Sequence, residues 1–294
     1  NRRPPRVSLA PAALTLLLGA CVVDPGSERP EAWGSADAPR AGCLGDGDGI
    51  LEPGELVLAG DIELRSSFVV NAPDAEVPAP ILGDGPWPLR PEVASSDRLL
   101  ELGPEAPESA WFSDRFPDAD FVALMDASTG TWGAWRLSEE ALLLLGIASE
   151  APGTTVLAYS PPVAVLPLPM AVGDAWSVEA EAEGLVDGEP VPRDLGLDGV
   201  ISLRHRWAFE VTAFGPAELP LGELPVLRLR STLRAELHNS AAGLVASDLQ
   251  RADLYVAECL GIVARVRSRI DEPLVDFTTA VEVLRLGVEG ELIP

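Results

Sequence analysis

The chain has 294 residues, of which 47% are hydrophobic and only 5% aromatic, so it can bury a sizeable core built mainly from aliphatic side chains. Its formal net charge of −25 argues against nucleic acid as a partner, because phosphate binding needs clustered cations. All 21 basic residues are arginine, which excludes Schiff-base, phosphate-loop and general-base chemistry by lysine.

The first 20 residues have the three-part layout of a secretory signal peptide. Three arginines precede an apolar run over residues 7–20, and the signal boundary reads Leu18-Gly-Ala-Cys21. These last four residues resemble the lipobox of bacterial lipoproteins, which implies cleavage before Cys21 and acylation of that cysteine. An ordinary signal peptide or an uncleaved anchor is the alternative, although the run is short for the about 30 Å of bilayer hydrocarbon.

Acyl chains on Cys21 would hold the protein at a membrane, because two or three chains bind durably where one binds marginally. We therefore expect a lipid-anchored protein of the cell envelope, exposed to the periplasm, with the membrane as its partner. In the lipoprotein family an Asp after the modified cysteine favours the inner membrane; Val22 occupies this position here and favours the outer membrane. Residues 21–42 are rich in Pro, Gly, Ser and Ala and predict a flexible, lipid-modified tether.

An acidic, glycine-rich segment follows at residues 43–55 and contains the run Gly45-Asp-Gly-Asp-Gly-Ile-Leu-Glu-Pro-Gly-Glu55. Closely spaced carboxylates separated by turn-permissive glycines suit Ca²⁺, which takes six to eight oxygen ligands. The segment resembles the calcium loop of EF-hand and dockerin proteins. The resemblance implies that Asp46, Asp48 and Glu55 supply carboxylates and that Ile50 supplies its carbonyl oxygen.

Two features of this segment depart from the calcium-loop family. Leu44 occupies the first ligand position, where an Asp belongs, and a tether and a strand replace the flanking helices. An acidic turn without an ion is therefore the alternative to a Ca²⁺ cofactor.

Residues 56–165 predict a smaller, β-rich N-terminal lobe. Apolar and polar residues alternate over residues 56–70, and residues 121–125 and 131–136 have the pattern of a hairpin. One short helix is expected near residues 138–148, where Ser138 and two glutamates precede a run of leucines and can cap its first turn.

Residues 166–294 predict a C-terminal antiparallel β lobe. Period-two alternation runs over residues 176–183, 201–213, 227–237 and 262–270, with one apolar and one charged face on each strand. Strands of about ten residues with this pattern favour a curved sheet or half-barrel over a sandwich. The predicted fold class is therefore mainly β.

Four short pieces of this lobe resemble an uncharacterised family of periplasmic β proteins. The pieces are Val172-Gly-Asp-Ala-Trp176, Phe209-Glu-Val-Thr-Ala213, Leu224-Pro-Val-Leu-Arg-Leu229 and Gly261-Ile-Val-Ala-Arg-Val266. The resemblance implies that the first piece opens a strand and that the last closes the sheet. The family has no established activity that could be transferred to this chain.

Two cysteines remain besides Cys21. In an oxidising compartment Cys43 and Cys259 predict a disulfide, which would join the acidic segment to the strand near residues 255–260. Two separate thiols, with Cys259 buried as a small hydrophobic residue, are the alternative.

The two histidines do not predict a metal site. His205 has the apolar parity of its strand and is expected in the core, whereas His238 has the charged parity and is expected in solvent. Two histidines in such positions do not favour zinc, and the chain has no HExxH pattern.

The sequence predicts a non-enzymatic binding or structural module, with no residue assigned to catalysis. It contains neither the GxSxG elbow of a serine hydrolase nor a phosphate-binding GxGxxG loop. One alternative is a carrier or chaperone whose concave β face holds an apolar ligand against Trp176, Trp207 and Phe209. A second alternative is a hydrolase that uses a pair of acids, of which the chain has 46 to choose from.

Overall fold

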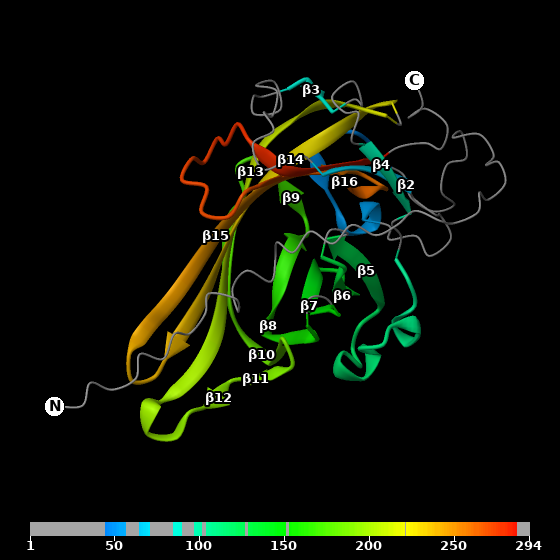
Figure 1. Cartoon of the computed structure of the whole chain (residues 1–294). Helices are drawn as coiled ribbons and strands as arrows, with labels where there is room; N and C mark the ends of the chain where they lie inside the picture. The colour runs from blue at the N-terminus through cyan, green and yellow to red at the C-terminus, as the bar shows by residue number, and fades with distance from the viewer. Residues whose placement is uncertain are drawn as a thin grey trace.

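The computed structural model describes residues 45–56, 65–70, 85–89, 97–101, 104–126, 129–150, 153–220 and 222–286. Over these residues the chain is mainly β, as predicted, and its C-terminal half forms a curled antiparallel half-barrel (Figure 1). The helical segments in this part of the chain are short 3₁₀ turns: η3 (Pro53–Glu55), η6 (Pro107–Ser109), η7 (Ser113–Arg115) and η8 (Gly196–Asp198). None of the described helices has the length and apolar character needed to cross a membrane.

One sheet of 15 strands carries most of the fold, in the hydrogen-bonded order β4-β2-β17-β16-β15-β14-β13-β10-β8-β7-β6-β5. The strands of its first half are β2 (Arg65–Val70), β3 (Trp87–Pro88), β4 (Asp97–Glu101), β5 (Phe121–Asp126), β6 (Thr131–Leu137), β7 (Ala141–Ser149) and β8 (Thr155–Pro167). Those of its second half are β10 (Ala175–Val186), β11 (Glu189–Val191), β12 (Arg193–Asp194), β13 (Val200–Leu219), β14 (Gly222–Asn239), β15 (Gly243–Ala257), β16 (Gly261–Ser268) and β17 (Ala280–Leu286). A separate two-stranded sheet joins β1 (Ile50–Leu51) to β9 (Met170–Ala171).

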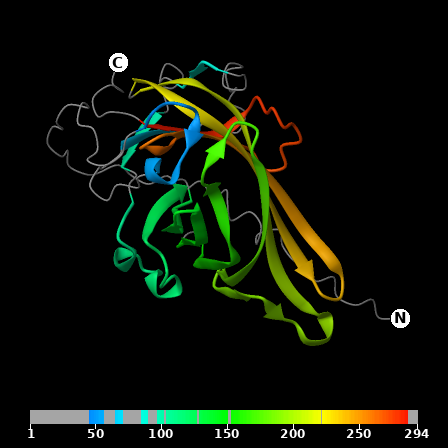
Figure 2. The ribbon, with the colours of Figure 1, turned by 180° about the vertical axis from the view of Figure 1, so that it is seen from behind.

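The three longest strands form an arm that projects beyond the rest of the sheet (Figures 1 and 2). β13 has 20 residues, β14 has 18 and β15 has 15. Leu203, Trp207 and Phe209 of β13 point into the core, while the arginines between them face outward. One of these, Arg204, lies 3.1 Å from Glu179 and 2.6 Å from Glu181 on the neighbouring strand β10. The alternation predicted for this lobe is therefore present.

The helix predicted near residues 138–148 is wrong. The leucine run forms β7, and Ser138 caps a tight turn between β6 and β7, where its hydroxyl accepts the backbone N–H of Ala141 at 3.0 Å. β7 is buried on both faces, so its sequence lacks the polar alternation that marks a half-buried strand. A short apolar run of this kind does not distinguish a strand from a buried helix.

The other predictions for the N-terminal lobe have mixed outcomes. The hairpin is confirmed, because β5 and β6 pair antiparallel from Phe121 opposite Trp135 to Asp126 opposite Thr131. In the predicted alternation over residues 56–70, residues 65–70 form β2, and residues 57–64 lie outside the described segments.

The largest hydrophobic cluster takes in residues from both halves of the chain. Trp135 of β6 and Leu144 of β7 belong to the same cluster as Phe209 of β13 and Leu254 of β15. A second cluster lies around Trp87, Tyr255 and Phe277 and packs on the face of β16 opposite to the largest cluster. A smaller one surrounds the phenylalanines that flank η7, Phe112 and Phe116. The two predicted lobes thus contribute to one packed interior.

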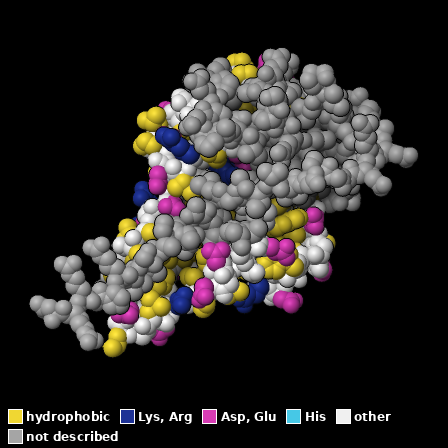
Figure 3. All heavy atoms as spheres, in the orientation of Figure 1, with side chains coloured by type: hydrophobic (Ala, Val, Ile, Leu, Met, Phe, Trp, Pro, Cys, Tyr) yellow, Lys and Arg dark blue, Asp and Glu magenta, His cyan; other side chains and the backbone are white. Residues whose placement is uncertain are grey.

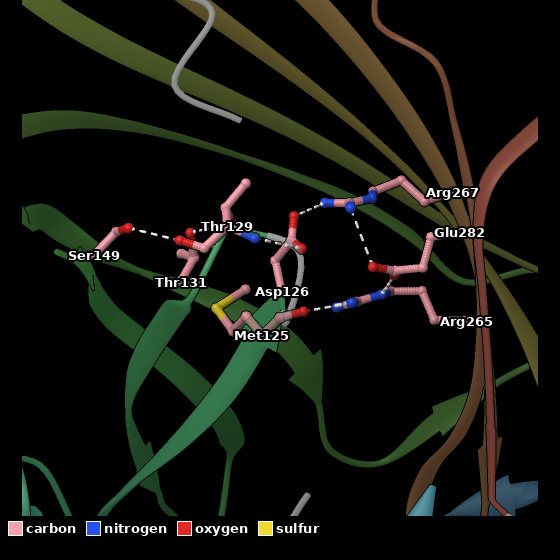
Figure 4. A network of polar contacts seen from close by, with 8 residues as sticks. All are labelled: Met125, Asp126, Thr129, Thr131, Ser149, Arg265, Arg267 and Glu282. Carbon is pink, nitrogen blue, oxygen red and sulfur yellow. Dashed lines mark hydrogen bonds and ion pairs between the residues drawn. The ribbon is translucent and has the colours of Figure 1, made fainter. Parts of the chain in front are cut away.

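A buried ion-pair network links the ends of this sheet (Figure 4). Arg267 of β16 donates to Asp126 of β5 at 2.5 Å and to Glu282 of β17 at 3.0 Å. Arg265 donates to the other oxygen of Glu282 at 2.5 Å and also to the carbonyl oxygen of Met125. Burial lowers the pKa of Arg267, but the nearby Glu282 and Asp126 carboxylates more than offset it and hold that pKa above its ordinary value.

The side of the sheet on which the network lies follows from the strand register. Arg265 stands opposite Leu254, a member of the largest cluster, and Arg267 stands opposite Ala252 on the same face. The charged parity predicted for residues 262–270 therefore faces the interior at these two positions. Asp126 and Glu282 compensate the charges of the two arginines. Because this face is inside the protein as well, β16 is buried on both sides.

The substitution Asp126→Asn is expected to destabilise the protein by about 3–5 kcal/mol, because it removes one of the two carboxylates that compensate the buried charge of Arg267. Urea denaturation measures this loss. Glu189→Gln is the matched control, since it breaks the exposed Arg193–Glu189 pair and should leave the free energy of unfolding almost unchanged. Equal small effects of the two substitutions would contradict a stabilising role for the network.

Candidate functional site

The acidic segment predicted to bind calcium forms a tight loop before β1. The side chain of Asp46 accepts the N–H of Asp48 at 3.1 Å, and the side chain of Asp48 accepts the N–H of Ile50 at 2.8 Å. Gly47 and Gly49 have φ values of 71° and 83°, which other residues rarely adopt. The glycines thus allow the turns that hold the two aspartates on one side of the loop.

A third carboxylate reaches the loop from the turn between β15 and β16. Glu258 accepts the backbone N–H of Gly47 at 2.8 Å. One carboxylate oxygen from each of Asp46, Asp48 and Glu258 lies within 4.8 Å of the others. The sequence did not predict Glu258, because no local spacing relates a residue in this turn to a loop 211 positions earlier.

Glu55, the third carboxylate predicted to bind the ion, has a different local role. Its side chain is buried and accepts the N–H of Glu52 at 3.0 Å, as part of a reciprocal capping box around η3. It is not a member of the acidic group formed by Asp46, Asp48 and Glu258. Ile50 begins β1 and pairs with Ala171 of β9, which places its backbone next to the loop.

The acidic group has the chemistry of a weak calcium site. Three carboxylates provide part of the six to eight oxygens that Ca²⁺ takes, and water and backbone carbonyls would supply the rest. A cation would also reduce the repulsion among three negative charges held this close together. Because Asp46 and Asp48 are exposed, an ion bound there would remain in contact with solvent.

Backbone contacts fasten the loop to the body of the protein. The N–H of Cys259 donates to the carbonyl oxygen of Glu55 at 2.6 Å, and β1 pairs with β9. Gly45 packs so closely on Glu258 that a Cβ at position 45 would lie 2.6 Å from the Glu258 carboxylate. Cys21, Cys43 and Leu44 lie outside the described residues, so the acylation and the Cys43–Cys259 disulfide stay predictions. The contact at Gly45 places the chain two residues after Cys43 beside the turn that holds Cys259.

The two histidines occupy different environments. His205 is in the core, as predicted, and its Nδ1 lies 3.2 Å from the hydroxyl of Tyr159. Burial lowers the pKa of His205 to about 4 and raises that of Tyr159. His238 is half-buried rather than fully solvated, and its Nε2 lies 3.0 Å from Glu236.

The aromatic residues suggested to line a ligand chamber are each in contact with other ring side chains. Trp176 stacks on Phe209 with ring centroids 5.1 Å apart, and its indole N–H donates to the carbonyl oxygen of Ala164 at 2.9 Å. Trp207 makes edge contacts with Tyr159 at 5.0 Å and with His205 at 5.3 Å. Trp207 and Phe209 belong to the buried core, and the half-buried Trp176 packs against it.

The buried acids that a hydrolase would need lie mostly beside arginines. Asp126 and Glu282 belong to the network on β16, and Asp253 of β15 lies 2.8 Å from Arg228. Burial raises the pKa of Asp253, and the two neighbouring arginines, Arg228 and Arg230, act in the opposite direction. These positions are typical of structural ion pairs.

Comparison with known proteins identifies no relative. No protein-family model, no curated protein and no solved structure matches the chain. The candidate site therefore depends on its own geometry and on the sequence pattern of the acidic loop.

The buried state of His205 predicts a loss of stability at acid pH. The folded protein keeps this ring neutral down to about pH 4, whereas the unfolded chain protonates it below its ordinary pKa of 6.5. The neutral ring therefore costs the folded state nothing above pH 6.5. As the pH falls from 6.5 to 4, the free energy of unfolding decreases, by about 2 kcal/mol at pH 5.

Urea denaturation at pH 7.5 and pH 5 measures this effect. Between these two conditions the His205→Leu variant should lose about 2 kcal/mol less than the parent protein, because it has no ring to protonate. The matched control is Leu203→Val, which changes a buried side chain of the same strand without removing a titratable group and should show the pH dependence of the parent. The same pH dependence in the parent and His205→Leu would show that His205 is not the group responsible.

Proposed function

We propose that this chain is a lipid-anchored protein of the bacterial envelope and that its folded part is a non-enzymatic binding or structural module. The observation that carries the proposal is the fastened loop over residues 45–56. This loop follows directly on the predicted tether and is bound to the β15–β16 turn and to β9. A protein held through its N-terminus needs such a joint, because force on the tether then enters the sheet instead of unravelling the first strand.

Calcium is the proposed cofactor of this joint. Asp46 and Asp48 come from the tether side and Glu258 from the body, so one ion would cross-link the two. The proposed Cys43–Cys259 disulfide would act at the same place, since Cys259 is bonded through its backbone to Glu55. Both devices would stabilise the joint in an oxidising, calcium-containing compartment.

The packing of the interior favours this function over the two alternatives. Trp176, Trp207 and Phe209 are in contact with their neighbours in the core, which offers less support to a carrier of apolar ligands. The buried Asp126 and Glu282 lie beside arginine, which offers less support to an acid-pair hydrolase. A module that presents its surface to a partner is consistent with both observations.

Acylation of Cys21 is the direct test of the anchor. When the full chain is expressed in a bacterium fed with labelled palmitate, the protein should become labelled and should partition into the detergent phase of a Triton X-114 extract. The Cys21→Ser variant should remain unlabelled, whereas Cys259→Ser should still be labelled. An unlabelled parent protein would refute the anchor.

Calcium titration tests the joint independently of the anchor. The parent protein should bind one Ca²⁺ with a dissociation constant of about 10⁻⁴–10⁻³ M, and its free energy of unfolding should rise by about 2.7 kcal/mol at a hundredfold excess over that constant. Calorimetry and thermal melting measure both quantities. Glu258→Gln should abolish the effect, and the exposed Glu108→Gln, outside the acidic group, should preserve it. Binding that survives Glu258→Gln would exclude Glu258 as a ligand.

A further inference from the structure

The far end of the arm carries an exposed apolar cluster, here called the arm tip. It combines the segment between β12 and β13, together with the first residue of β13, with the first residues of β15 that follow the β14–β15 turn. Its members are Leu195, Leu197, Val200, Leu244 and Val245. Leu197 is fully exposed at 104%, and Leu244 is 55% exposed. Figure 3 shows hydrophobic and acidic side chains together at this end of the molecule.

The two turns of the arm tip form one unit. Val200 and Ser240 bond to each other twice: the N–H of Val200 donates to the Ser240 hydroxyl at 2.9 Å, and the N–H of Ser240 donates to the Val200 carbonyl at 2.9 Å. The side chain of Asn239 donates to the carbonyl oxygen of Asp198 at 2.9 Å. The apolar side chains are therefore held together at the end of a stiff support.

Much of the backbone of the arm tip is hydrogen-bonded internally. The N–H groups of Ala241 and Ala242 both donate to the Asn239 side chain, at 2.8 and 3.0 Å. The N–H of Leu195 donates to the carbonyl oxygen of Gly199 at 2.9 Å. Satisfied backbone groups are the condition for placing a loop against hydrocarbon, where water is not available as a partner.

Shape and charge indicate the kind of surface that the arm tip fits. The arm tip offers five apolar side chains, whereas a standard protein interface takes about 20–30 residues from each partner. A convex tip with a fully exposed leucine fits a deformable apolar medium better than a rigid groove. The charged residues here are the exposed Arg193 and Asp194 of β12 and the exposed Asp198 of the segment that follows. They sum to one negative charge, which a net-neutral lipid surface tolerates better than an anionic one.

We propose that the arm tip inserts its leucines and valines into the headgroup region of a net-neutral lipid bilayer. This inference rests on the proposed lipid anchor, because acyl chains on Cys21 would bring the body to such a surface. The anchor and the arm tip would then fix the protein to the membrane at two points and orient its body. Shallow insertion follows from Asp194 and Asp198, which remain at the level of the headgroups.

Quenching by brominated lipid tests this contact in the full, acylated protein. The protein is reconstituted into vesicles of brominated phosphatidylcholine, and the added tryptophan of a Leu197→Trp or Leu244→Trp variant is measured against the parent background. Both added emissions should shift to the blue and lose most of their intensity to the bromine. Leu274→Trp is the matched control, because Leu274 is 56% exposed on the segment between β16 and β17, away from the arm tip in both ribbon views, and its emission should not change.

The outcomes separate the arm tip from the anchor. Vesicle-bound protein in which the Leu197→Trp and Leu244→Trp emissions stay unquenched would overturn the arm-tip proposal and leave the anchor intact. Protein that does not bind the vesicles at all would overturn both. A blue shift that follows protein concentration in the absence of lipid would assign the arm tip to contact with a second copy and would also overturn the proposal.

Discussion

The fold depends on the ion pairs that Arg265 and Arg267 make with Asp126 and Glu282 across the inside of the curled sheet. β5 is the last strand at one end of the hydrogen-bonded order, whereas β16 and β17 stand close to the other end. No backbone ladder among the described strands joins these two regions, so side chains make the connection. Removing one member of such a buried pair is strongly destabilising, so we expect the closed sheet to unfold cooperatively.

The acidic loop and the arm are both connected to β16, the strand that carries the two arginines of the network. The acidic loop is fastened at the turn between β15 and β16, and β16 carries both arginines of the network. The arm consists of β13, β14 and β15, the strands that continue the same sheet on the other side of β16. A force on the tether and a contact at the arm tip would therefore act on one connected group of strands.

The strands that the sequence predicts are those with one buried face. On β13 burial alternates with exposure, so Leu203, Trp207 and Phe209 mark the period of two directly. β7 has two buried faces and its leucines carry no such mark, which is why the sequence favoured a helix there.

The parts that sequence reasoning missed depend on long-range contacts. Arg267 was placed on a charged face, but its partner Asp126, which compensates the buried charge, lies 141 positions away in the sequence. Glu258 reaches Gly47 across 211 positions, so the acidic loop was predicted from its own residues with Glu55 as a ligand. Local spacing did indicate a turn here, since Gly47 and Gly49 adopt positive φ and the Asp46 and Asp48 side chains each accept an N–H two residues on. Glu258, the third carboxylate of the acidic group, could be identified only from the folded structure.

Native-state hydrogen exchange tests the closure most directly. If the network makes the sheet one cooperative unit, the slowest amides of β5 and β6 should open with the same free energy as those of β16 and β17, and both should equal the free energy of global unfolding. In the Asp126→Asn variant the two regions should lose protection together. Amides of β5 and β6 that already exchange through a separate, lower-energy opening in the parent protein would contradict the account.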